Sequence, residues 1–298
     1  MRIFVTGATG FVGAAVVKEL IGAGHEVIGL ARSDAAVKSL MAAGAQVHKG
    51  DLEDLASLRE GAANADGIIH TAFNHDFSKF KDSCGTDRRV IELFGTVLAG
   101  SERPLVVTSA LGILPQGHLA TEETLSVSGP AGHLRAASEE AAMMTGKHGV
   151  RVAVIRLAPT VHGEGDHNFI PILIRLAKEK GISAYIGEGS NCWPAVHRLD
   201  AARLFRLVLE KGVAGSRYHA VAEEGIPFRE IAGVIGRQLN LPVVSITPQE
   251  AANHFGWFVN FAAMDVPALS QLTREQLAWQ PTQLGLIQDL SLPHYFKA

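Results

Sequence analysis

The sequence has few of the residues that hold small secreted proteins or metal sites together. Its two cysteines, Cys84 and Cys192, are too few for a disulfide framework, and neither has neighbours at zinc-ligand spacing. We therefore expect free thiols in a reducing compartment and no metal site.

Long runs of one residue class are missing as well. No stretch of Lys and Arg occurs, and the net charge is -3 over 298 residues, so the chain lacks the electrostatic signature of a nucleic-acid or membrane-surface protein. No apolar run reaches transmembrane length, and Arg2 leads straight into a strand-like run rather than into a signal peptide. These features predict a soluble, cytoplasmic protein whose partner is a small-molecule substrate, with no nucleic acid and no membrane.

The strongest pattern lies at the start of the chain. Residues 2–6 (RIFVT) are strand-like, a glycine-rich turn follows, 11–23 has helical periodicity, and 25–30 (HEVIGL) is strand-like again. The turn reads G-x-x-G-x-x-G, and after a strand and before a helix this spacing favours a dinucleotide site over an empty turn. The free N–H groups of the helix start suit a diphosphate. We expect the phosphates to contact Gly7, Thr9, Gly10, Phe11, Val12 and Gly13.

The end of the second predicted strand indicates which dinucleotide binds. An acidic residue there selects NAD by binding the ribose hydroxyls, whereas an Arg accommodates a 2′-phosphate. This chain has Ala31, Arg32 and Ser33 at that point. The pattern predicts NADP as the cofactor, and the alternative is that Arg32 is a solvated loop charge.

Further strand-like runs alternate with helical stretches and lie at 46–49, 66–70, 104–109 and 151–157. This alternation predicts an α/β fold, a doubly wound parallel sheet of the Rossmann type. The pattern changes near residue 165. We expect a dinucleotide-binding domain over 1–165 and a smaller, mostly helical substrate lobe over 166–298, interleaved with returns to the main sheet.

Ligands of such sheets bind at the carboxyl ends of the strands. Asp51 follows the third predicted strand, where it can reach an adenine amine or cap the helix predicted at 54–60, and both readings stay open. Other residues at or just beyond strand ends are cofactor-binding candidates, namely Leu52, Thr71, Ala72, Thr108 and Pro159.

Several motifs, in order over nearly the whole chain, resemble the extended short-chain dehydrogenase/reductase superfamily of the NAD-dependent epimerase/dehydratase type. They are TGATGFVG at 6–13, GDL at 50–52, IHTA at 69–72, VTSA at 107–110, RLAPTVHG at 156–163, VHRLD at 196–200 and LAWQP at 277–281. The resemblance implies a Rossmann-type sheet, a bound dinucleotide and a C-terminal substrate lobe. It also implies a possible homodimer through helices expected at 83–99 and 132–148.

The chain departs from that superfamily at its catalytic motif. The superfamily uses a Ser or Thr after the fifth strand and a Tyr-x-x-x-Lys on the next helix, in which Tyr exchanges a proton with the substrate. Here no Tyr lies between residues 1 and 184. Alignment on Glu139 puts Arg135 at the Lys position and Ala131 at the Tyr position. The chain thus resembles an atypical subgroup with basic residues in place of Tyr and Lys.

A carbonyl reductase without this Tyr needs another proton donor, and histidine suits neutral pH. The candidates are His133, His75 and His162, and the alternative for each is a surface or structural histidine. Arg135 keeps its proton, so we expect it to hold the cofactor and to stabilise charge at the substrate oxygen. We expect Ser109 to orient that oxygen, with strand-end hydrogen bonding as the alternative.

The sequence therefore predicts an NADP-dependent oxidoreductase that reduces a carbonyl, or oxidises the secondary alcohol, of a small, fairly apolar molecule. The alternative is a non-catalytic NAD(P)-binding regulatory or redox-sensing protein, which the missing Tyr favours. An epimerase or dehydratase of nucleotide sugars is the least favoured, because it needs the Tyr. Aromatic residues that can line a pocket, or equally pack in the core, are Phe73, Phe77, Trp193 and Tyr185.

Overall fold

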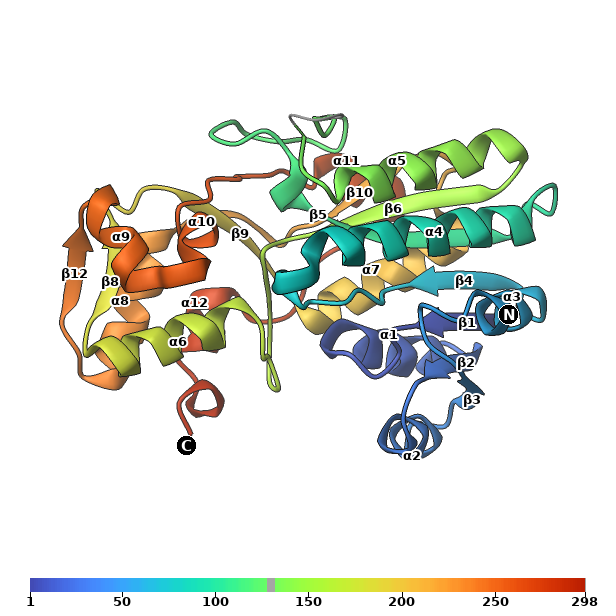
Figure 1. The fold of residues 1–298 in the computed structure, drawn as a ribbon, viewed down its shortest axis with the longest axis horizontal. Helices are drawn as coiled ribbons and strands as arrows, with labels where there is room; N and C mark the ends of the chain where they lie inside the picture. Colours follow the sequence, from blue (N-terminus) through green and yellow to red (C-terminus); the bar gives the residue numbers. More distant parts are fainter. Residues whose placement is uncertain (128–131, 298) are drawn as a thin grey trace.

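The computed structural model describes residues 1–127 and 132–297, and a seven-stranded sheet forms its centre (Figure 1). The strand order is β10-β6-β5-β4-β1-β2-β3, and every neighbouring pair is parallel. The strands are β1 (Arg2–Thr6), β2 (Glu26–Ala31), β3 (Gln46–Lys49), β4 (Gly67–His70), β5 (Pro104–Ala110), β6 (Arg151–Leu157) and β10 (Arg217–Ala220). The predicted Rossmann-type α/β sheet is confirmed.

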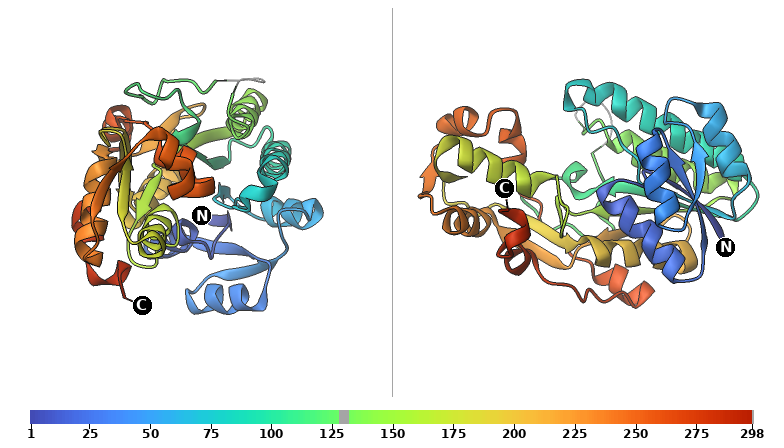
Figure 2. Two further views of the ribbon diagram at one scale, coloured as in Figure 1. Left: turned by 60° about the vertical axis from the view of Figure 1, so that its left-hand side comes forward. Right: turned by 90° about the horizontal axis from the view of Figure 1, so that it is seen from below.

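Helices cover both faces of this sheet, as Figure 2 shows. Alternate strand residues supply the two cores, since Val5 faces one side and Phe4 the other. The Val5 side packs against α1 (Phe11–Gly22), α2 (Asp34–Ala42) and α7 (Arg198–Lys211), and the Phe4 side against α3 (Leu55–Ala63), α4 (Phe80–Leu98) and α5 (Ala136–Thr145). Two-sided burial explains why these strands read as continuous apolar runs in the sequence.

A smaller lobe with its own apolar core lies beyond the carboxyl ends of the strands (Figure 1). Its helices are α6 (Phe169–Lys180), α8 (Phe228–Leu239), α9 (Pro248–Phe255), α10 (Val259–Ala262) and α12 (Leu286–Leu290), and β8 (Ser183–Ile186) pairs with β12 (Val243–Ile246). A second sheet joins β7 (Thr160–His162), β9 (Cys192–His197) and β11 (Glu223–Pro227). A further helix, α11 (Gln271–Leu277), packs near α7 and β10.

The chain crosses between the sheet and the lobe more than once. After β6 it enters the lobe, where it forms α6, β8 and β9. It then returns to the large sheet, where α7 packs against α1 and β10 pairs with β6. The domain boundary expected at residue 165 therefore stays a prediction.

Two helix boundaries differ from the predicted ones near the site. The helix expected from residue 132 begins only at Ala136, with Arg135 as its N-cap, because Gly132 disfavours helix and His133 Nδ1 accepts the Arg135 N–H. The helix expected from residue 83 begins at Phe80, after a 3-10 turn (Phe77–Lys79) that the Asp76 carboxylate caps. Within the described ranges, no helix is both long and apolar enough to cross a bilayer.

Candidate functional site

The glycine-rich turn joins β1 to α1, and its shape depends on the absence of side chains. Gly7 has φ +66, and a Cβ there would lie 2.7 Å from the Ala72 nitrogen. A Cβ on Gly13 would lie 2.0 Å from the Gly7 carbonyl oxygen, so α1 rests directly on the turn. These two contacts require glycine, in agreement with the roles expected of the first and third glycines of a dinucleotide-binding turn.

The first turn of α1 has the character of an anion site. Gly10 is the N-cap, no side chain caps the helix, and no acidic residue lies in its first turn. The N–H groups of Phe11, Val12 and Gly13 come too early in the helix to have intrahelical acceptors. Together with the exposed Thr9, they form a cradle that fits the diphosphate of a dinucleotide.

The predicted ribose end lies at the tip of β2. Ala31 is buried as the last strand residue, while Arg32 and Ser33 are exposed beyond it. Ser33 is the N-cap of α2, since its hydroxyl accepts from the Ala36 N–H at 3.2 Å. Ser33 can still donate its own proton, and Arg32 forms no ion pair within the described part of the chain, so both remain available to a phosphate.

Asp51 lies beyond β3, and its contacts decide whether it caps the helix that follows. Its carboxylate accepts from the N–H groups of Glu53 and Asp54 at 2.7 and 3.1 Å, which closes a turn. The cap of α3 is Asp54, whose side chain accepts from the Ser57 N–H at 3.0 Å. The helix-cap reading of Asp51 is therefore wrong, and the adenine reading stays a prediction, as does the role of the adjacent Leu52, which is packed against the core below α3.

The threonines at the strand ends tie neighbouring strands together. The Thr71 hydroxyl donates to the Thr6 carbonyl at 2.7 Å, and the Thr108 hydroxyl donates to the His70 carbonyl at 2.8 Å. Thr71 and Ala72 remain partly exposed, and Pro159 lies between β6 and β7 at the same edge. These residues line the edge that a nicotinamide would approach.

Arg135 lies at the start of α5, over the loop that follows β4. Its guanidinium carbon is 4.0 Å from the centroid of the Phe73 ring, a cation–π contact. Burial lowers the pKa of Arg135, and the nearby Asp87 carboxylate opposes that shift. Its buried Nε has no hydrogen-bond partner in the described ranges. Arg135 is therefore a cation with unused donors, whereas Ala131, the residue aligned with the missing Tyr, lies outside the described residues.

Two of the three candidate histidines lie beside Arg135. The His75 ring is 5.2 Å from that of Phe73, and the His133 ring is 5.5 Å from that of Phe80. Burial and the charge of Arg135 lower the pKa of both histidines. A hydrogen bond with the Phe73 backbone opposes the shift at His75. The structure thus brings His75 to Arg135 and His133, about 60 residues further along the chain.

A buried polar chain runs beneath this group and was not expected from the sequence. Thr6 Oγ1 lies 2.6 Å from His70 Nδ1, and His70 Nε2 lies 2.9 Å from Asp87 Oδ1, all three residues being almost fully buried. Burial alone raises the pKa of Asp87, but its hydrogen bond to His70 and the charges of His70 and Arg135 hold it below the usual value. This carboxylate therefore fixes a negative charge under Arg135.

The structure does not bring Ser109 to this group. Its hydroxyl donates to Glu139 at 3.0 Å, inside a buried network in which Glu139 also pairs with Arg156 and Arg217. This placement matches the strand-end hydrogen-bonding alternative. His162 is also enclosed, with its Nδ1 at 2.8 Å from Asp289, which matches the structural alternative for that histidine.

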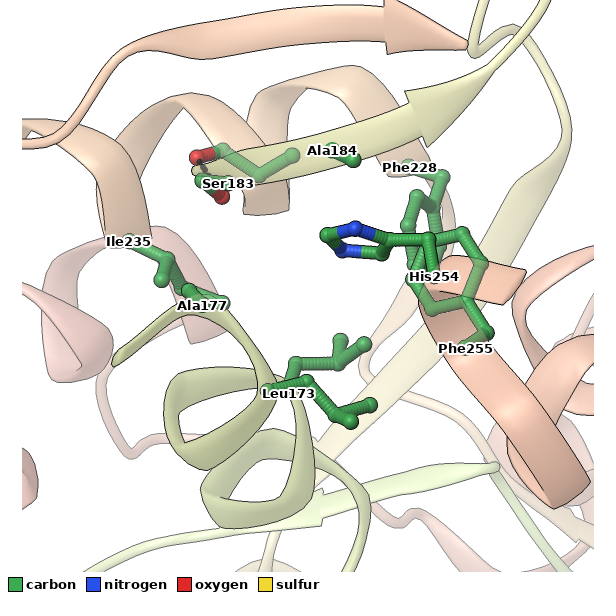
Figure 3. Close-up of a pocket in the computed structure, with 10 residues that line it drawn as sticks. Leu173, Ala177, Ser183, Ala184, Phe228, Ile235, His254 and Phe255 are labelled. Carbon is green, nitrogen blue, oxygen red and sulfur yellow. Dashed lines mark hydrogen bonds between the residues drawn. The ribbon is translucent and has the colours of Figure 1, made fainter. Parts of the chain in front are cut away.

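The four aromatic residues considered for a pocket separate into two sets. Phe73 and Phe77 lie with the histidines, whereas Trp193 is fully buried in the core of the lobe and Tyr185 borders an open hollow of about 360 Å³ beside α8. A small cavity also lies in the lobe, lined by Leu173, Phe228, Ile235 and His254 among others (Figure 3). At about 10 Å³ it has room for about one water molecule and for no substrate.

Among residues 1–127 and 132–297, no group of three or more His, Cys, Asp or Glu side chains is arranged to hold a metal ion.

Comparison with known proteins agrees with this geometry. The profile of the NAD dependent epimerase/dehydratase family matches residues 3–221. Uncharacterized proteins of Schizosaccharomyces pombe and Saccharomyces cerevisiae are 52% and 47% identical, over 99% and 97% of this chain and 100% and 98% of theirs. A decarboxylating sterol-4-alpha-carboxylate 3-dehydrogenase of Dictyostelium discoideum is 28% identical over 77% of this chain and 74% of its own.

Solved structures share the fold. A nucleoside-diphosphate-sugar epimerase from Pseudomonas aeruginosa superposes with a TM-score of 0.78 at 18% identity, over 97% of this chain and 95% of its own. A dTDP-glucose 4,6-dehydratase from Streptomyces venezuelae, solved with NAD bound, has a TM-score of 0.74 at 21% identity, over 98% and 95%. The glycine cradle, the sheet topology and the profile match together lead to one conclusion: the chain belongs to the NAD-dependent epimerase/dehydratase family.

Proposed function

We propose that this family member is an NADP-dependent oxidoreductase that reduces a carbonyl, or oxidises the corresponding alcohol, in a small apolar molecule. The observation that carries the proposal is the convergence of Arg135, His75 and His133 on Phe73 and Phe80, at the sheet edge that holds the glycine cradle. A bound nicotinamide supplies or accepts the hydride.

Arg135 takes the electrostatic role in this proposal. Hydride transfer to a carbonyl leaves negative charge on the oxygen, and a fixed cation in a water-poor site stabilises that charge. The ring of Phe73 contacts the guanidinium and the charge of Asp87 favours its cationic form, while its Nε is left without a hydrogen-bond partner in the described ranges. Arg135 cannot be the proton donor, because it stays protonated.

His75 is our proposed proton donor, in preference to His133. The Nδ1 atom of His133 accepts the Arg135 N–H at 3.2 Å, and protonation at that nitrogen would break this bond. Protonation of His75 breaks no such hydrogen bond, and its hydrogen bond with the Phe73 backbone favours the protonated ring. The lowered pKa of His75 makes it a stronger acid toward a developing alkoxide and a poorer proton reservoir at high pH.

The preference for NADP is supported by Arg32 and Ser33, which are exposed beyond an acid-free strand end. A guanidinium and a hydroxyl at that point complement a 2′-phosphate, as an acidic residue would not.

The test is turnover by the purified protein. We expect NADPH oxidation with at least some members of a panel of aldehydes, ketones and imines, and slower oxidation of NADH. Turnover with neither cofactor across the panel, despite calorimetric binding of NADPH, would contradict the reductase function.

One observation favours a non-catalytic, cofactor-binding regulator as the second candidate. None of the three tyrosines is near Arg135: Tyr218 is buried with its hydroxyl on the Val213 N–H, Tyr295 lies near Asp289, and Tyr185 borders the hollow beside α8. Tight NADPH binding with no turnover is the result that would select this candidate.

We also propose a homodimer formed through α4 and α5, which lie side by side on one face of the sheet (Figure 1). Half-exposed Met144 and Arg88 on their outer surfaces offer apolar and charged contacts to a second copy. Light scattering at micromolar concentration tests this, and the mass of a single chain would contradict it.

A further inference from the structure

The side chains around the proposed proton donor belong to a cluster of aromatic rings, which we call the interlobe cluster. It consists of Phe73, Phe77, Phe80, Trp257 and Phe261. The first three follow β4, and the last two belong to the lobe, on the 3-10 turn Gly256–Phe258 and on α10. Segments about 180 residues apart in sequence therefore meet in one aromatic surface.

The rings are in contact across the two lobes. The Phe77 centroid lies 5.4 Å from Trp257 and 5.4 Å from Phe261, and 5.9 Å from Phe80, with which it stacks. Phe80 meets Phe73 at 6.0 Å. These spacings are those of interacting aromatic pairs.

The interlobe cluster differs from the aromatic core of the protein in its access to solvent. Phe258, Phe228 and Trp193 are fully buried, whereas every ring of the cluster is partly exposed and Trp257 is 54% exposed. Trp257 is the one aromatic side chain among the large apolar residues that the described structure leaves strongly exposed. Exposed aromatic surface of this kind beside polar groups is typical of a ligand site.

The charged groups on this surface indicate what charge the ligand carries. Arg135 is the one arginine or lysine stacked on these rings in the described ranges, and the other polar contacts are His75 and His133. A nucleotide sugar needs further cations for its diphosphate, and a cationic ligand would be repelled by Arg135. An uncharged ligand with a π-system and one carbonyl group complements this surface. Its ring can stack on Phe77 and Trp257 while its oxygen contacts Arg135 and His75.

We infer that the interlobe cluster is a stacking site for an uncharged aryl or conjugated ketone or aldehyde. This inference rests on the proposed function and names the substrate class for that site. The reductant would be a reduced nicotinamide dinucleotide, which loses a hydride and is oxidised by two electrons. The hydride forms a C–H bond at the carbonyl carbon, the C=O π-pair moves to oxygen, and the N–H bond of protonated His75 breaks to give its proton to that oxygen.

The experiment compares acetophenone with cyclohexyl methyl ketone, which have the same heavy-atom skeleton and differ in ring unsaturation. Saturating NADP⁺ blocks reduction, so binding is measured without turnover. Trp193 and Trp279 are both 0% exposed, so a change in intrinsic fluorescence on binding reports on Trp257. We expect acetophenone to change the fluorescence and to bind at least about tenfold more tightly than its saturated partner.

Two variants separate stacking from bulk apolar contact. Phe77→Leu keeps Trp257 as the reporter and should remove most of the difference between the two ketones. Trp257→Phe should keep the selectivity in kcat/KM or in calorimetry, and Trp257→Leu should lose it.

Equal dissociation constants for the two ketones, or no binding of either, would overturn the inference whatever the turnover. Selective binding of acetophenone with no oxidation of NADPH would instead contradict the reductase function and leave the stacking site standing. If Phe77→Leu lowers Tm but preserves the selectivity, the rings are an interlobe brace and the inference is wrong.

Discussion

The two halves of the sheet edge are built in different ways. At β1 the site consists of backbone, with glycines that bring carbonyl and N–H groups into contact and a helix start with unused donors. At β4 and β5 it consists of side chains held by other side chains, such as Arg135 on Phe73 over Asp87. In the proposed function, the first half binds a group common to all dinucleotides, and the second determines which molecule reacts.

This difference sets how each half tolerates change. A site made of backbone groups loses binding when a side chain fills its space, and most neighbouring substitutions leave its binding unchanged. A side-chain site loses function gradually and selectively, because each group has a separate role. Variants that affect cofactor binding and variants that affect turnover should therefore fall in separate halves.

The largest effect should come from the proposed proton donor. We expect His75→Ala to lower kcat by roughly 10²- to 10⁴-fold with little change in NADPH affinity, because proton transfer is lost while the cradle is intact. His133→Ala is the matched control and should retain most of the turnover. The reverse pattern would transfer the donor role to His133, and full activity in both variants would end the histidine hypothesis.

One added methyl group in the glycine-rich turn should weaken cofactor binding. In Gly13→Ala the new Cβ would lie 2.0 Å from the Gly7 carbonyl oxygen, so we expect NADPH binding to weaken by about 100-fold in calorimetry. Gly22→Ala, at the other end of α1, adds a methyl group where no atom lies within 4 Å, and should bind NADPH normally. Similar affinities for the two variants would show that the turn relaxes.

Cofactor choice should respond to Arg32. Arg32→Ala removes the proposed partner of the 2′-phosphate and should cost about 1–3 kcal/mol of NADPH binding, with NADH binding nearly unchanged. Parallel titrations of both cofactors measure this. An equal loss for the two would make Arg32 a general contributor to affinity and leave the NADP preference without support.

The smallest effect should be a displacement of the pH profile. Burial first, then the charge of Arg135 and that of His167, lower the pKa of His75 below its ordinary 6.5, while the Phe73 backbone and Asp87 oppose them. If His75 is the proton donor, reduction requires its protonated form, so kcat/KM should fall as pH rises through this lowered pKa. Alcohol oxidation requires the neutral ring and should rise over the same window.

Removing a charge next to His75 sharpens this pH test. In Arg135→Gln the residual activity should have its profile displaced to higher pH, because one cause of the lowered pKa is gone. Arg32→Gln, which alters a charge remote from His75, is the control. An unmoved profile in Arg135→Gln would mean that another group limits the rate.

The backbone half could be predicted from the sequence because its determinants are local. The turn and both ends of α1 lie within residues 6–23, where spacing alone specifies strand, turn and helix. The two readings of Asp51 could not be separated from the sequence, because a second carboxylate, Asp54, lies three residues further on and caps α3 instead. The short helices α9 to α12 are too brief to show a clear period.

The side-chain half depends on contacts that only the fold creates. Phe77 and Trp257 are in contact because the lobe folds back over the edge of the sheet. The spacing of residues in the sequence cannot predict a contact of this kind. One missed signal was available: Asp87 lies on the apolar face of α4, at helical spacing before Val90, Ile91 and Phe94. A carboxylate at such a position needs a buried partner, which is His70.

The position of β10 at the edge of the sheet also constrains how the protein is made. β6 pairs with β5 on one side, and its other edge gains a neighbour only when residues 217–220 are made, after much of the second lobe has been synthesised. Until then a nascent chain exposes the outer edge of β6 and the apolar surface of α1 that α7 later covers, and both features promote aggregation. A chain truncated after residue 165 would keep both features permanently, so we expect the large sheet to depend on the second lobe for its solubility.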